Sequence, residues 1–275
     1  MTLGHTGRHA CIHPWPYPER VLEIPRSARL AAWGTAWLQG RTSTGGVVRA
    51  VTGDDEPHRV EPADLVPSAD LEGLLTALRE AGVSALRVVL PVPGDPLGLP
   101  GPPAFNTAAL DAGECVVASS GSAWGAVPEV TEFGSEWEPG YLVTWQVRPV
   151  AESRHLGADG LADAERALKE GLLEATSRLT RLDVAALGPD AAEELRRLRR
   201  AEIPPGILPA GTPARSLQVL STAGRLRAVL SLAARDDGAA VNVFEAQERA
   251  RTLRELDVVC RHAVVAAVNA ATQSP

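Results

Sequence analysis

A loop rich in glycine and proline, residues 94–107, carries the side chains best suited to bind a small molecule. It follows an apolar run, residues 86–92, that is typical of a buried strand. In open α/β sheets, ligands collect at the carboxyl ends of such strands. Glycines in the loop would also let backbone amides approach an anion closely. The predicted ligand-binding residues are Gly94, Asp95, Gly98, Gly101, Asn106, Thr107 and Arg87.

The same loop has a second interpretation, a rigid crossover whose prolines lower the entropy of the unfolded chain. Its glycine spacing matches neither a phosphate-binding P-loop nor a dinucleotide-binding fingerprint. The sequence therefore predicts a place where a ligand could bind but no nucleotide cofactor, and we expect no cofactor of any kind.

An acidic segment is the second candidate, with Glu129, Glu132, Glu136 and Glu138 within ten residues. Paired carboxylates can transfer protons or hold a hard cation, provided that two of them converge. The alternative is a solvated hairpin tip, because charge runs are usually exposed. Glu129 and Glu132 lie where a predicted strand ends rather than at the tip of the hairpin. If the protein is an enzyme, the candidate catalytic residues are Asp95, Glu129 and Glu132, which we expect to converge beside Arg87.

Histidines and cysteines give weaker signals. His5, His9, Cys11 and His13 could bind zinc or nickel, but their segment has no predicted scaffold, so we predict no metal site. His155 and His262 lack the sequence context of a catalytic base. The motifs of serine hydrolases, zinc proteases and kinases do not occur.

Composition excludes several classes of protein. With 275 residues and 45% hydrophobic content, the chain can bury a full core. A net charge of -7 argues against a mainly electrostatic nucleic-acid binder. Three widely separated cysteines suit a reducing cytoplasm. No segment reaches the roughly 20 apolar residues that a membrane span requires, so we expect a cytoplasmic protein that binds neither nucleic acid nor membrane.

The elements that must position these residues predict an α+β protein. Residues 1–25 read as an irregular proline-rich arm, and residues 27–39 and 68–82 as helices, the second capped by Ser68. Residues 58–60 read as a short edge strand. Strands at 86–92, 114–119, 124–130 and 141–147 surround a short helix at 104–112, and two hairpin connections favour a small mixed sheet flanked by helices.

The second half of the chain reads as helices at 159–181, 189–202, 212–235 and 242–271. We expect this helical region, residues 151–275, to pack on the sheet-containing region, residues 26–150, as one compact unit. Many alanines on the last helix would let another helix approach closely. Homo-oligomerisation through that helix is therefore a further expectation.

Two runs, residues 89–101 and 127–134, resemble a family of uncharacterised actinobacterial proteins. The resemblance covers most of the chain and implies no activity, cofactor or partner. The preferred functional hypothesis is a non-catalytic binding or accessory protein that recognises a small molecule or a protein through loop 94–107 and the acidic hairpin 129–140. The alternative is a small-molecule hydrolase or transferase that uses carboxylates from the same segments.

Overall fold

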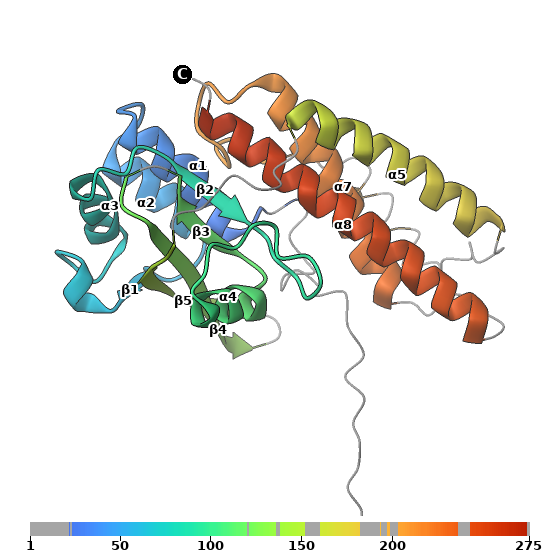
Figure 1. Cartoon of the computed structure of the whole chain (residues 1–275), viewed down its shortest axis with the longest axis horizontal. Coiled ribbons are helices and arrows are strands. Elements are labelled where there is room, and N and C mark those ends of the chain that lie inside the picture. The colour runs from blue at the N-terminus through green and yellow to red at the C-terminus, as the bar shows by residue number, and fades with distance from the viewer. Residues whose placement is uncertain are drawn as a thin grey trace, which may run out of the picture.

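A computed structural model describes residues 22, 24–119, 121–135, 138–151, 160–181, 193, 197–198, 203–235 and 243–273. The sheet-containing half holds four helices, a 3-10 turn and five strands in these residues: α1 Arg26–Leu38, α2 Thr44–Thr52, β1 Arg59–Glu61, η1 Ala63–Leu65, α3 Leu71–Glu80, β2 Leu86–Val89, α4 Pro103–Ala112, β3 Cys115–Ala118, β4 Trp124–Ser135 and β5 Glu138–Pro149. The other half holds α5 Leu161–Arg181, α7 Ala214–Arg235 and α8 Val243–Gln273 (Figure 1). Most of the predicted helix 189–202 and nearly all of the arm 1–25 lie outside the described residues.

The strands form one mixed sheet in the order β1-β5-β4-β3-β2. Strand β1 is parallel to β5, and the other three pairs are antiparallel. The two predicted hairpins, β3–β4 and β4–β5, are therefore confirmed, as is the short edge strand β1. The α+β prediction holds because consecutive strands pair locally, while the helices gather on the faces and beside one edge of the sheet.

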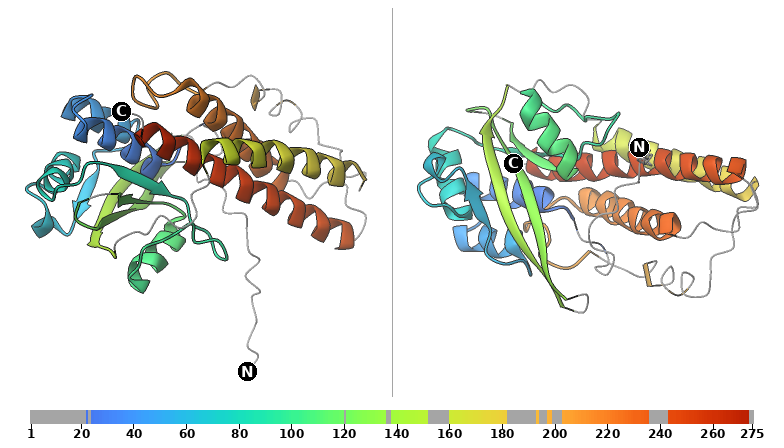
Figure 2. Two further views of the ribbon diagram at one scale, coloured as in Figure 1. Left: turned by 45° about the horizontal axis from the view of Figure 1, so that its top comes forward. Right: turned by 90° about the horizontal axis from the view of Figure 1, so that it is seen from below.

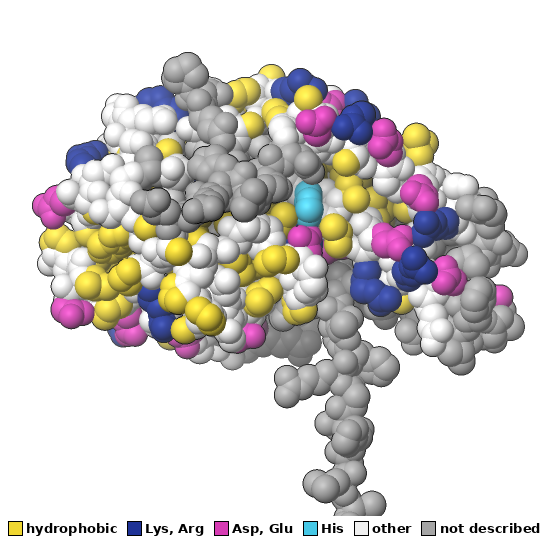
Figure 3. All heavy atoms as spheres, viewed as in Figure 1, with side chains coloured by type: hydrophobic (Ala, Val, Ile, Leu, Met, Phe, Trp, Pro, Cys, Tyr) yellow, Lys and Arg dark blue, Asp and Glu magenta, His cyan; other side chains and the backbone are white. Residues whose placement is uncertain are grey.

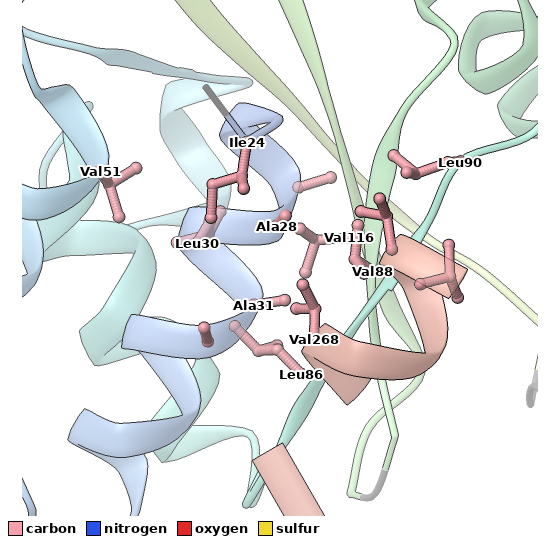
Figure 4. Packing of buried hydrophobic residues seen from close by; sticks show 14 of the residues in the cluster. Ile24, Ala28, Leu30, Ala31, Val51, Leu86, Val88, Leu90, Val116 and Val268 are labelled. Atoms are coloured by element: carbon pink, nitrogen blue, oxygen red, sulfur yellow. The ribbon is translucent and has the colours of Figure 1, made fainter. Parts of the chain in front are cut away.

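Two clusters of buried side chains cover opposite faces of the sheet. The larger packs α1, α2, α3 and α8 against alternate strand residues such as Leu86, Val88 and Val116. Figure 4 shows Val268 of α8 among these side chains. The smaller cluster places Phe105 of α4 against the intervening residues, including Val89. Alternation of side chains along each strand produces the two faces.

Helix α3 begins two residues later than expected. Its N-cap is Asp70, whose Oδ1 accepts the Gly73 N–H at 2.8 Å. The predicted cap, Ser68, donates its hydroxyl to the same carboxylate at 2.7 Å. The prediction of Ser68 was wrong because a carboxylate at position 70 reaches the helix N-terminus, and its negative charge suits that end of the helix.

The three helices of the second half lie side by side, with α8 packed against both α5 and α7 (Figures 1 and 2). The later part of α8 continues into the first half and contacts α1 and β2. Its small residues Cys260, Ala263 and Ala267 are fully buried inside the chain. The face that we expected to support homo-oligomerisation is therefore occupied by other parts of the same chain. Within the described residues, no helix combines the length and the apolar character of a membrane span.

Strand β2 differs from its prediction in length and position. It ends at Val89 rather than residue 92, and it is an edge strand antiparallel to β3. All four of its residues are nevertheless buried, because helices cover the edge. The rule that ligands gather at the carboxyl ends of parallel strands does not apply to this strand.

Candidate functional site

Asp95 joins the two halves of the chain. Its Oδ2 accepts a hydrogen bond from Arg261 Nη2 at 2.6 Å and lies 2.7 Å from His262 Nε2, both on α8. A tight turn presents the carboxylate, since Val92 and Asp95 exchange two backbone hydrogen bonds of 3.1 and 2.9 Å across Gly94. Gly94 has φ +89°, a conformation that favours glycine. The loop after β2 is therefore fastened to α8.

This cluster is only partly open to solvent. The side chains of Asp95 and His262 are 26% and 29% exposed, whereas that of Arg261 is 2% exposed. Burial acts to raise the pKa of Asp95, but hydrogen bonds and positive charge from His262 and Arg261 outweigh it and hold the pKa below its usual value. Asp95 is thus an ionised carboxylate at neutral pH, which suits an anchor better than a general acid.

Side chains from two helices complete the open edge of β2. The Thr35 hydroxyl accepts the Leu86 N–H at 2.9 Å and donates to the Leu86 carbonyl at 3.3 Å. Asn269 accepts the Val88 N–H at 2.9 Å and donates to the Val88 carbonyl at 3.2 Å. Arg261 Nη1 donates to the Leu90 carbonyl at 2.5 Å. We call Thr35, Asn269 and Arg261 the edge clamp, because together they satisfy backbone groups that would otherwise be unpaired.

Several of the predicted ligand-binding residues are used within the chain. Asn106 accepts the Gly101 N–H at 2.8 Å, and the Leu99 N–H donates to Pro96. Thr107 is exposed on α4, and Arg87 is buried on β2 in register with Val117. Gly94, Gly98 and Gly101 all have positive φ, as glycines in turns do. These contacts favour the interpretation of the loop as a rigid crossover.

The candidate carboxylates contact different parts of the chain. Asp95 contacts α8, whereas Glu129 accepts a hydrogen bond from Gln146 on β5 at 3.3 Å. Gln146 also donates to Glu61 on β1, and Glu132 is exposed further along β4. Within the described residues, Asp95 and Glu129 share no contact partner. The expected convergence of Asp95, Glu129 and Glu132 beside Arg87 finds no support in these contacts.

The acidic segment belongs to a long two-stranded ribbon. Strands β4 and β5 pair over twelve residues, from Trp124 opposite Pro149 to Ser135 opposite Glu138. In contrast, β3 pairs only with Gly125 and Ala126, and β1 pairs only with residues 144–146. The end of the hairpin therefore extends past both neighbouring strands (Figure 2, right). We call residues 130–135 and 138–143 the projecting ribbon.

Two large apolar side chains are exposed on the projecting ribbon. Phe133 is 43% exposed and Leu142 is 47% exposed. Both lie on the face turned away from the main core, because Val130 and Val143, which alternate with them, pack toward that core. The ring of Phe133 covers Gly140 directly opposite, where an added Cβ would lie 2.4 Å from the ring. Glu129 and Thr131 share this face.

A second polar cluster is buried in the sheet-containing half and has a structural role. Arg26 binds both oxygens of Asp55 at 2.6 Å, and Asp55 Oδ2 lies 3.2 Å from His58 Nε2. Trp145 Nε1 donates to His58 Nδ1 at 3.1 Å. Burial lowers the pKa of His58 more than Asp55 raises it. The neutral ring therefore carries its proton on Nε2 and links α1, the loop after α2, and β5.

Figure 3 shows acidic and basic side chains intermingled over the protruding helices, and a histidine beside an acidic side chain where the two halves meet. Sequence reasoning missed Arg261, His262 and Asn269 as contact residues. Their signal was present, since they interrupt the otherwise apolar stretch of α8 at residues 258–271, and a buried polar group requires a partner. Within the described residues, no three His, Cys, Asp or Glu side chains are grouped to hold a metal ion.

Comparisons with known proteins identify the family to which this chain is similar. Two family models match the chain, "Rv1486c-like protein, N-terminal domain" over residues 27–159 and "Rv1486c-like protein, C-terminal domain" over residues 162–265. An uncharacterised protein of Mycobacterium tuberculosis, Rv1486c, is 30% identical over 90% of this chain and 97% of its own length. An uncharacterised Mycobacterium leprae protein, ML1804, is 26% identical over 90% and 97% of the two chains.

The same comparisons match an uncharacterised Mycobacterium avium protein, MAV321, which is 27% identical over 76% of this chain and 78% of its own. No solved structure matches the chain. The relatives carry no stated activity, and the resemblance to uncharacterised actinobacterial proteins is confirmed. This chain belongs to the Rv1486c-like family, whose two domain models divide the protein between the sheet-containing half and the helical half.

Proposed function

We propose that this protein is a non-catalytic binding protein that recognises a protein partner through the projecting ribbon. The observation that carries the proposal is the exposure of Phe133 and Leu142 on a ribbon that extends past both neighbouring strands. Contiguous exposed apolar side chains with a polar surround are typical of interaction sites. Aromatic residues in particular supply much of the binding energy in protein interfaces.

The placement of charge supports the same proposal. Between Trp124 and Pro149 the chain has four glutamates and one basic residue, Arg148, at the base of the ribbon. An acidic surround would steer a basic partner toward the apolar side chains and reject acidic proteins. Loop 94–107, the other half of the predicted recognition surface, is engaged with α8 and with its own backbone, so we assign it to docking the two halves.

A cytoplasmic location is part of this proposal. Cys115 and Cys260 are free and buried, and burial raises the pKa of the Cys260 thiol to about 12. Such thiols are unreactive, and unpaired cysteines are typical of proteins in reducing compartments.

Site-specific crosslinking tests the proposal. In one variant, a photoreactive phenylalanine analogue would replace Leu142. In a matched control variant, the same analogue would replace Leu173, an exposed leucine on α5. We expect a discrete crosslinked partner from position 142 and none from position 173 in cells that make the protein naturally. With that partner purified, Leu142→Asp should weaken binding about tenfold, while Leu173→Asp should not change it. Equal effects at the two positions would refute the proposal.

One observation favours the enzyme alternative. His262 and Asp95 form a carboxylate–imidazole pair that is about a quarter exposed, and such pairs transfer protons in many enzymes. The pair is bound by Arg261, and the other candidate carboxylates lie elsewhere, which is why we rank this function second.

A thermal-shift screen against nucleotides, sugar phosphates and acyl-CoA compounds tests this alternative. A ligand at about 100 times its dissociation constant adds about 2.7 kcal/mol to the stability of a protein that binds it only when folded. The alternative requires a shift that is lost in His262→Gln and retained in Glu132→Gln. The absence of any shift across these compounds would count against it.

A further inference from the structure

Among the described residues, the outer edge of β4 has backbone groups without a partner beyond the point where β3 ends. The Tyr141 carbonyl accepts the Glu56 N–H, on the side of β5 away from β4. Tyr141 and its partner Glu132 are therefore a pair that does not exchange backbone hydrogen bonds. By the same alternation, the N–H and carbonyl groups of Val130, Glu132 and Gly134 point outward from the ribbon. Within the described part of the chain, no hydrogen bond to them is found.

The start of β3 at Cys115, just after α4, and Pro128 on β4 both limit the pairing of β3 with β4. The last register pair between the two strands is Val116 with Ala126, and the next outward-facing position on β4 is residue 128. Proline has no N–H to donate, so the ladder cannot continue through it. The free edge thus begins at Val130 and extends to Gly134, which leaves room for a strand about as short as β2 or β3.

We propose that a partner protein adds an antiparallel strand to this free edge of β4, at Val130, Glu132 and Gly134. The inference rests on the proposed function and specifies how the projecting ribbon binds. Exposed strand edges recruit extended segments through main-chain hydrogen bonds, while alternate side chains provide specificity. The partner segment would alternate basic and apolar residues.

The alternation of basic and apolar residues in the partner segment follows from the two faces of β4. Partner residues that bond to Val130 and Glu132 place their side chains on the Glu132 face, because residues directly opposite in a ladder share a face. Basic side chains there would pair with Glu132. The intervening residues lie on the other face, beside Phe133 and Leu142, and apolar side chains suit that surface.

A second copy of this chain fits the edge poorly. Two ribbons in contact would bring eight glutamates together with only Arg148 of each copy as a base. Like charges placed across an interface cost free energy and are used to reject wrong partners. Charge complementarity therefore selects a basic segment of another protein rather than self-association.

Fluorescence anisotropy with synthetic peptides tests the proposal on the full chain. The probe is a labelled nonapeptide of alternating lysine and valine, and its control replaces each lysine with glutamate. Two further probes carry backbone N-methyl groups, either on the lysines or on the valines. We expect the unmodified probe to bind, N-methylation of the lysines to abolish binding, and N-methylation of the valines to leave it within about twofold. Equal effects of the two N-methylated probes would overturn strand addition.

Two variants of Glu132 distinguish the contribution of its backbone N–H to binding from the contribution of its charge. Glu132→Pro removes an outward N–H that the β4–β5 ladder does not use, so the ribbon should keep its fold, which circular dichroism and melting temperature check. It should weaken binding about tenfold or more, whereas Glu132→Gln, which keeps the N–H, should weaken it about two- to threefold. Equal affinity of wild type and Glu132→Pro would also overturn the inference. Crosslinking at position 142 without any preference between the N-methylated probes would leave the proposed function standing and reject only strand addition.

Discussion

Asn269 binds both backbone groups of Val88, so a side-chain amide on α8 takes the place that a neighbouring strand would take on β2. The two residues are 181 positions apart in the chain. This contact, with those of Thr35 and Arg261, allows an edge strand to be as buried as a central one.

Replacing Asn269 should therefore cost stability beyond the loss of one contact. Asn269→Ala leaves a buried N–H and a buried carbonyl of Val88 unpaired, for which we expect about 2–4 kcal/mol of destabilisation. Asn106→Ala is the control, because Asn106 is less buried and accepts only the Gly101 N–H, and it should cost about 1 kcal/mol. Urea denaturation of both variants measures the difference, and similar costs would contradict the account of the edge clamp.

Asp95 should make the stability of the folded protein depend on pH in the acid range. Its pKa is lowered in the folded protein, so its contribution is complete above the unfolded pKa of about 3.9 and is lost as the pH falls through the lower folded value. Asp95→Asn should destabilise the protein by about 1–3 kcal/mol at neutral pH and flatten the loss of stability at acid pH. Melting temperature between pH 7 and pH 3 checks both effects. Asp111→Asn, which makes the same substitution at an exposed position of α4, is the control variant.

His58 should make the stability of the folded protein depend on pH in a higher range than Asp95 does. Its pKa is lowered by burial, so below about 6.5 the unfolded chain takes up a proton that the folded chain does not, and stability falls as the pH decreases toward the folded pKa. Protonation would also place an N–H against the Trp145 N–H. His58→Asn can keep an acceptor for Trp145 but cannot titrate, and it should remove up to about 1.4 kcal/mol of this loss per pH unit. Parallel stability curves for wild type and variant between pH 7.5 and 5.5 would show that His58 is not responsible.

Two glycines should respond in opposite directions to the same substitution. A Cβ at Gly125 would lie 2.5 Å from the Phe105 ring and 2.7 Å from Val150, so Gly125→Ala should cost about 1–3 kcal/mol by overpacking. At Gly171 in α5 the nearest atoms, of Val259 and Leu256, are 3.5 Å away or more. Gly171→Ala should therefore stabilise the helix by about 0.5–1 kcal/mol. Thermal denaturation of the two variants shows whether each substitution raises or lowers the melting temperature.

Local patterns explain which elements could be predicted. Helices α3, α7 and α8 show apolar stripes and nearby start or stop residues, and they were placed within a few residues of their bounds. The hairpins β3–β4 and β4–β5 join neighbouring segments, so a short loop was enough to indicate pairing. These features depend on residues close together in the sequence.

The remaining features depend on residues far apart. Strand β2 reads as a buried strand because its residues are apolar except for Arg87, yet its burial comes from helices α1 and α8 over an edge. Asp95 and His262 are 167 positions apart, and no spacing rule relates them. A polar residue in an apolar helix predicts that a partner exists, but only the packing of the two halves determines which one.

The edge clamp has a consequence for how the chain is made. A ribosome adding 5–20 residues per second needs roughly 10–40 seconds to reach Asn269 after it has passed Val88. During that interval the nascent sheet can fold around α1, but the Val88 position of its β2 edge has no cover. Bare strand edges pair readily with other chains. We therefore expect newly synthesised molecules to expose this edge to pairing with other chains until the last helix folds against it.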